Sequence, residues 1–91
     1  MKEKNVKEAV KKYLKSIKAW YYMPVSVGYG IASLDFFVCH NGRFYGIETK
    51  REGVNKMTPR QECTMREIAE AGGGVCLENS MGLENVKALI K

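Results

Sequence analysis

The chain has 91 residues, enough for one small core, so we expect a single domain over residues 1–91. A charge of +5 and a hydrophobic fraction of 45% are typical of a soluble domain that can bind a polyanion. The three cysteines are odd in number and lack CxxC spacing, which argues against a disulfide framework and a zinc site. The sequence has neither an apolar run of membrane-spanning length nor a signal peptide, so we expect a cytoplasmic protein.

Residues 3–18 predict an amphipathic helix, because apolar residues recur at helical spacing on one side and lysines cover the other. The apolar residues are Val6, Val10, Tyr13, Leu14 and Ile17. Glu3 borders this stripe, whereas Glu8 points away from it, so Glu3 is the better candidate for an acid that reaches a site on a sheet. An acid in the first turn also complements the helix dipole, and that structural role of Glu3 is equally open.

Residues 20–27 are aromatic and β-branched and therefore predict a strand, with Pro24 at an edge or a bulge. The next segment, residues 28–33, begins Gly-Tyr-Gly and predicts a flexible loop that leads into the Asp35 strand. Its glycines would let the backbone approach a phosphate, but the ending of a P-loop is missing and a tight turn is the simpler role. Tyr29 is a candidate for stacking on nucleic acid, and packing against the core is an equally open role.

Residues 34–51 predict a β-hairpin around an Asn41-Gly42 turn. Such a pair between β-rich segments favours a type I′ turn, since both of its central residues need positive φ. Counting outward from the turn places Asp35 opposite Glu48. The same count pairs His40 with Arg43, Cys39 with Phe44, and Phe37 with Gly46.

Side chains alternate along a strand, so Asp35, Glu48 and Lys50 are expected on one face of this hairpin and the Thr49 side chain on the other. Two opposed carboxylates repel unless a cation neutralises them. Mg²⁺ takes carboxylate and phosphate oxygens, so the pattern outlines a metal-dependent phosphodiesterase site. The alternative is an exposed pair for which Lys50 is only a salt-bridge partner. It is weaker, because the repulsion would destabilise the hairpin.

The segment after the hairpin carries Arg51 and Lys56, which are either phosphate contacts or solvated surface cations. A second helix is expected to begin at the Thr-Pro-Arg-Gln sequence of residues 58–61. Thr58 and Gln61 have the spacing of a capping box, which gives Gln61 a complete structural role. Gln61 also shares a helical stripe with Met65 and Ile68, so it is expected to face the sheet beside Lys50.

This helix is expected to end at Ala71, before a triple-glycine turn. Residues 74–78 predict a strand parallel to the Glu48 strand, because a right-handed crossover joins them. Ser80 is the expected cap of a last helix. Its apolar stripe comprises Leu83, Val86, Leu89 and Ile90. The predicted fold is α/β, in the order α-β-β-β-α-β-α.

Asp35, followed after the hairpin by Glu48-Thr49-Lys50, resembles the signature of the PD-(D/E)xK nuclease superfamily. The surrounding residues are similar to its VRR-NUC branch, and the resemblance covers nearly the whole chain. Besides an early Glu on the first helix, its motifs are Gly28-Tyr29-Gly30, Asn41-Gly42-Arg43-Phe44, Gly46-Ile47-Glu48-Thr49-Lys50, Thr58-Pro59-Arg60-Gln61 and Gly72-Gly73-Gly74. Leu34 stands where the family often has proline, which leaves the carboxylate of Asp35 in place.

The resemblance implies a restriction-endonuclease-like core, a central mixed sheet flanked by helices, and metal-dependent hydrolysis of DNA. It implies that Asp35, Glu48 and the backbone carbonyl of Thr49 hold Mg²⁺ or Mn²⁺. Lys50 would stabilise charge on the phosphate or assist deprotonation of water, and these two roles stay open. Gln61 would orient Lys50 or water, and Glu3 would contribute to the metal environment. The expected nucleic-acid contacts are Tyr29, Arg51, Lys56 and Arg60.

Small members of this branch look like structure-directed nucleases of the Holliday-junction type, often phage-encoded. The resemblance therefore implies a homodimeric endonuclease that acts on branched DNA in a bacterial or phage-infected cell, without a small-molecule cofactor or a membrane. Two other classes remain open. A non-catalytic basic nucleic-acid-binding module would explain the lysines but not the opposed carboxylates. A structural dimerisation domain would rest on the small size and on an aromatic edge at residues 20–22.

Overall fold

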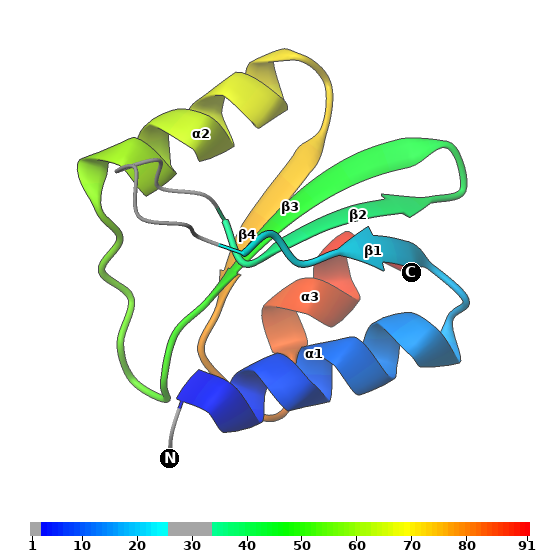
Figure 1. Ribbon diagram of the computed structural model, residues 1–91, viewed down its shortest axis with the longest axis vertical. Coiled ribbons are helices and arrows are strands. Elements are labelled where there is room, and N and C mark those ends of the chain that lie inside the picture. The colour runs from blue at the N-terminus through cyan, green and yellow to red at the C-terminus, as the bar shows by residue number, and fades with distance from the viewer. Residues whose placement is uncertain (1–2, 26–33) are drawn as a thin grey trace.

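The computed structural model describes residues 3–25 and 34–91 (Figure 1). The elements are α1 (Glu3–Ser16), β1 (Trp20–Tyr22), β2 (Phe36–His40), β3 (Arg43–Thr49), α2 (Pro59–Glu70), β4 (Gly74–Glu78) and α3 (Glu84–Leu89). This order confirms the predicted α/β fold. The expected strand over residues 20–27 ends early, at Tyr22, because the chain soon reaches Pro24, which has no amide hydrogen for a ladder. The predicted loop at residues 28–33, with Tyr29, lies outside the described residues.

The four strands form one mixed sheet in the order β1-β2-β3-β4 (Figure 1). β1, β2 and β3 are antiparallel neighbours, and β4 runs parallel to β3. The predicted hairpin register is confirmed, with Phe37 opposite Gly46 and His40 opposite Arg43. Asn41 and Gly42 have φ values of 51° and 79°, as a type I′ turn requires.

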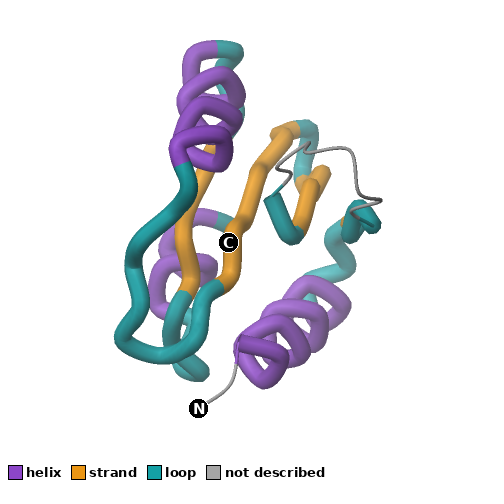
Figure 2. The backbone as a smooth tube through the Cα atoms, turned by 60° about the vertical axis from the view of Figure 1, so that its left-hand side comes forward, coloured by secondary structure: helices purple, strands orange, loops and turns teal. Residues whose placement is uncertain are grey.

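Helices cover both faces of the sheet, and Figures 1 and 2 show α1 and α2 apart, with strands between them. The main core lies on the α1 and α3 side. It contains Val6, Val10, Leu14, Phe36, Val38, Tyr45, Ile47, Leu83, Val86 and Ile90. On the other face α2 approaches β3 closely at Gly46. A Cβ there would come within 2.7 Å of Leu34 Cδ1 and 2.9 Å of Ile68 Cδ1, so a larger residue would displace the ends of these two side chains.

The ends of α2 match the sequence, whereas the start of α3 does not. Thr58 and Gln61 form the predicted capping box, and Ala71 is the C-cap. α3 is capped neither by Ser80, which accepts a hydrogen bond from the Gly82 N–H, nor by any other side chain at its N-cap position. Instead the buried carboxylate of Glu78 accepts the Val86 N–H at 2.9 Å. The Ser80 prediction was wrong because this cap is a tertiary contact, supplied by a neighbouring strand.

Within the described part of the chain, no helix combines the length and the apolar character that crossing a membrane requires.

Candidate active site

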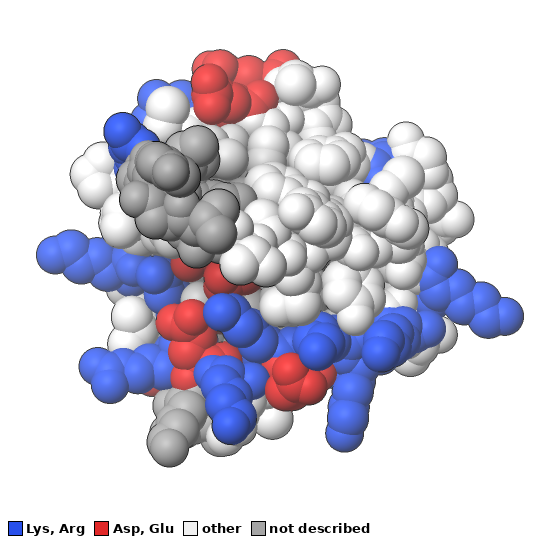
Figure 3. Space-filling view, in the orientation of Figure 1, with Lys and Arg blue, Asp and Glu red and all other residues white. Residues whose placement is uncertain are grey.

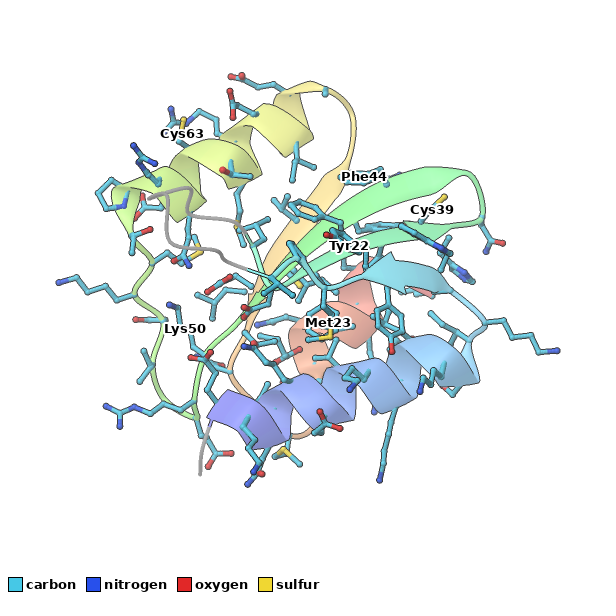
Figure 4. All side chains as sticks on the ribbon, in the orientation of Figure 1. Tyr22, Met23, Cys39, Phe44, Lys50 and Cys63 are labelled. Atoms are coloured by element: carbon cyan, nitrogen blue, oxygen red, sulfur yellow. The ribbon has the colours of Figure 1, made fainter. Side chains whose placement is uncertain are left out.

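The sequence-predicted acids meet at the C-terminal end of β3. The Asp35 N–H donates to Glu48 Oε1 at 3.2 Å, although Asp35 lies just before β2 and outside its ladder. The Lys50 ammonium lies 3.4 Å from Glu48 Oε2. Figure 4 shows Lys50 at the end of β3, between α1 and α2. Glu48 is only 3% exposed, so this carboxylate is held within the protein rather than on a solvated face.

Gln61 links α2 to this carboxylate. Its amide Nε2 donates to Glu48 Oε2 at 2.9 Å, while its Oε1 accepts the Thr58 N–H at 3.1 Å. The side chain therefore completes the capping box and contacts the site at the same time. The structural and the functional interpretations of Gln61 are compatible, and its contact in the site is with Glu48.

Thr49 contacts Asp35 through its side chain as well as its backbone, which corrects the expectation that only its backbone takes part in the site. Thr49 Oγ1 donates to Asp35 Oδ2 at 2.6 Å, and the Thr49 N–H donates to the same oxygen at 3.0 Å. The alternation of side chains along a strand does not apply to Asp35, because Asp35 precedes β2. Its carboxylate can therefore reach the end of β3.

The backbone carbonyl of Thr49 points toward the same side as Asp35. The Lys50 N–H donates to the Glu78 carbonyl of β4 at 2.9 Å, and the described peptide bonds are all trans. In a trans peptide the carbonyl points opposite to the N–H of the next residue, so the Thr49 carbonyl points away from β4. The ligand role of this carbonyl stays a prediction.

Sequence reasoning missed Lys7. Its ammonium lies 3.5 Å from Asp35 Oδ1 and 3.6 Å from Glu3 Oε2. The described contact of Glu3 is this ion pair, so Glu3 reaches the site through Lys7, whereas Glu8 pairs with Lys11. Lys7 follows Glu3 by one turn on the same side of the helix, a spacing that was available as a signal.

Three of the expected phosphate contacts lie on the chain between β3 and the first turn of α2. Arg51 and Lys56 are exposed on the segment between β3 and α2, and Arg60 is exposed in the first turn of α2. Figure 3 shows Lys and Arg side chains along α1 and on the neighbouring side of the molecule.

The pKa of Glu48 is raised from its ordinary 4.5 to about 7, first by burial and then by the negative charge of Asp35, while Lys50 offsets part of the rise. Over residues 3–25 and 34–91 no group of three His, Cys, Asp or Glu side chains is placed to hold a metal. A cation here would therefore combine two carboxylates with the Thr49 carbonyl, water and phosphate oxygens. This donor set fits Mg²⁺ or Mn²⁺, which favour oxygen ligands and retain water.

The raised pKa predicts how stability depends on pH in the absence of metal. The folded state keeps the Glu48 proton up to about pH 7, whereas the unfolded chain releases it near pH 4.5. The stability of the wild type relative to Glu48→Gln is therefore expected to fall by on the order of 2 kcal/mol as pH rises through this interval. Urea unfolding of both proteins in EDTA at pH 5 and pH 8 measures it. An unchanged difference between the two proteins would contradict the burial of a charged Glu48.

Comparisons with known proteins bear on the fold. No protein-family model matches the sequence, and no curated protein matches it either. A solved structure described as "VRR_NUC domain" superposes with a TM-score of 0.76 at 19% sequence identity. The match covers 96% of this chain and 91% of that chain. The likeness extends over the sheet and the helices that position Asp35, Glu48 and Lys50, so the chain has the fold of a VRR_NUC domain.

Proposed function

We propose that the protein is a metal-dependent endonuclease that hydrolyses phosphodiester bonds in DNA. The observation that carries this proposal is the pairing of Asp35 with the almost fully buried Glu48 beside Lys50, on a fold shared with a VRR_NUC domain. Buried like charges are costly, and a function that needs both carboxylates accounts for their retention. In this account Asp35, Glu48 and the Thr49 carbonyl hold Mg²⁺ or Mn²⁺.

The bound cation would withdraw charge from the scissile phosphate and lower the pKa of a coordinated water. The residues of the chain fix the geometry around it. Thr49 holds Asp35 Oδ2 with two hydrogen bonds, and Gln61 holds Glu48 Oε2. In this account the Lys50 ammonium, 3.4 Å from the same oxygen of Glu48, would stabilise the negative charge that develops on the phosphate.

Branched DNA is the substrate that we propose. The chain has 91 residues and a charge of +5, and the lysines and arginines visible in Figure 3 provide phosphate contacts that read shape rather than sequence. Arg51, Lys56 and Arg60 are the proposed contacts beside the site. A non-catalytic module would use the same cations but would gain nothing from opposed carboxylates.

Cleavage of labelled linear duplex, single-stranded, flap and four-way-junction DNA tests this proposal. We expect metal-dependent cutting, with branched substrates cut faster than the linear duplex. Equal cutting of all four would contradict structure-directed specificity and leave the nuclease intact. Binding without cutting in Mg²⁺ and in Mn²⁺ would favour the non-catalytic module.

The proposed homodimer has a candidate surface on the outer face of β1, β2 and β3. Trp20, Tyr22 and Phe44 are 62%, 54% and 45% exposed, and the register places all three on the face that α2 leaves open. Figure 3 shows no Lys, Arg, Asp or Glu over this part of the sheet. Two copies that each carry +5 repel least through an uncharged face, so a second copy of the chain is the partner that fits it.

Trp20→Glu is expected to shift a dimer toward monomers, with at least a tenfold rise in the dissociation constant, because it buries a charge at the interface. Sedimentation equilibrium without DNA or metal measures this. Met81→Glu places the same charge on another exposed apolar residue, 42% exposed, and should leave the dimer intact. A monomeric wild type, or equal effects of the two changes, would rule out this face as the interface.

A further inference from the structure

The two oxygens of Asp35 have different partners. Oδ2 accepts two hydrogen bonds from Thr49, at 2.6 Å and 3.0 Å. Oδ1 instead faces the Lys7 ammonium at 3.5 Å. A divalent cation that binds Asp35 without breaking the Thr49 contacts must therefore use Oδ1, the oxygen that Lys7 faces.

Lys7 is held in this position by a well-packed helix. Its neighbours Val6 and Val10 are fully buried in the main core, and the Lys7 side chain itself is 32% exposed. On its other side Glu3 Oε2 lies 3.6 Å from the ammonium, an i,i+4 pair within α1. The ammonium therefore lies between an acid of its own helix and an acid of the site.

We propose that Lys7 is a positioning residue that acts as an internal counter-ion and competes with the divalent cation for Asp35 Oδ1. This inference rests on the proposed metal-dependent function and adds a determinant of its metal affinity. Without metal, Lys7 neutralises part of the charge on the carboxylate pair. When a cation occupies Oδ1, the ammonium must give up its contact with Asp35, and its pairing with Glu3 keeps it nearby. The cation and the Lys7 contact therefore oppose each other, each weakening the other by the same factor.

Calorimetric titration with MnCl₂ tests this competition without any measurement of cleavage. Lys7→Met removes the charge and keeps the length of the side chain, so Mn²⁺ should bind about threefold to tenfold more tightly. The matched control is Lys11→Met, one turn further along α1. It makes the same change in net charge, but Lys11 pairs with Glu8. The control should bind Mn²⁺ within about twofold of the wild type.

Thermal unfolding provides a second measurement. In EDTA, Lys7→Met should unfold at a lower temperature than Lys11→Met, because only Lys7 neutralises the carboxylate pair. Saturating Mn²⁺ should abolish this difference, since the cation then replaces the ammonium. A difference that persists in Mn²⁺ would mean that Lys7 supports the fold rather than the charge balance of the site, and would overturn the proposal.

The titration separates the failure of this inference from the failure of the proposed function. If the wild type binds Mn²⁺ and Lys7→Met binds it equally or more weakly, Lys7 is not a competitor and the nuclease proposal stands. If neither protein binds Mn²⁺, the metal site itself is refuted, and the Lys7 proposal with it.

Discussion

Glu48→Gln is expected to lower metal-dependent DNA cleavage at least about a thousandfold. Glutamine has nearly the same shape but lacks the negative charge with which Glu48 would share a cation with Asp35. Its amide can still accept the Gln61 hydrogen bond that Glu48 Oε2 receives at 2.9 Å, so the fold should persist. Initial rates on a labelled four-way junction at saturating Mg²⁺ measure the loss.

Glu62→Gln is the matched control for this change. Glu62 is an exposed carboxylate in the first turn of α2, one residue after Gln61, and its neutralisation should change the rate by less than about threefold. Circular dichroism of both variants should match the wild type. Cleavage by Glu48→Gln at a rate near that of the wild type would remove Glu48 from the mechanism.

Phe36→Ala is expected to lower the free energy of unfolding by about 3–5 kcal/mol. Phe36 is fully buried and packs against the Tyr21 ring with centroids 5.8 Å apart, so its truncation leaves a cavity in the main core. It also follows Asp35 directly, and its anchoring fixes where that carboxylate enters the site. Urea unfolding in EDTA measures the change.

The comparison for this prediction is Met81→Ala, which truncates another large apolar side chain that is 42% exposed. Its cost is expected to stay within about 0.5 kcal/mol, as for surface substitutions. A loss at Phe36 no larger than the loss at Met81 would mean that this part of the sheet is not the packed core described above.

The sequence predicts those parts of the fold that are determined by residues close to one another in the chain. The Asn41-Gly42 turn determines the hairpin register, and the capping box marks the start of α2. Each of these depends on residues within a few positions of one another, where turn and cap chemistry is specific. That register brings Asp35 and Glu48 to the same end of the hairpin, although Asp35 lies just before β2.

Other features depend on tertiary contacts that no local pattern contains. Glu78 caps α3 from a neighbouring strand, and Lys7 meets Asp35 only because of how α1 packs beside the sheet. The contact of the Thr49 side chain with Asp35 was not predicted, because strand alternation does not extend to Asp35, which precedes β2. These contacts of the fold and of the site could be identified only from the structure.

The most direct test of the central claim follows one labelled four-way junction through three successive conditions with the purified protein. We predict cutting in Mg²⁺, arrest on addition of excess EDTA, and renewed cutting when Mg²⁺ is restored, with no cutting by Glu48→Gln throughout. Cutting that continues in EDTA, or equal cutting by Glu48→Gln, would contradict a metal-dependent site at Asp35 and Glu48.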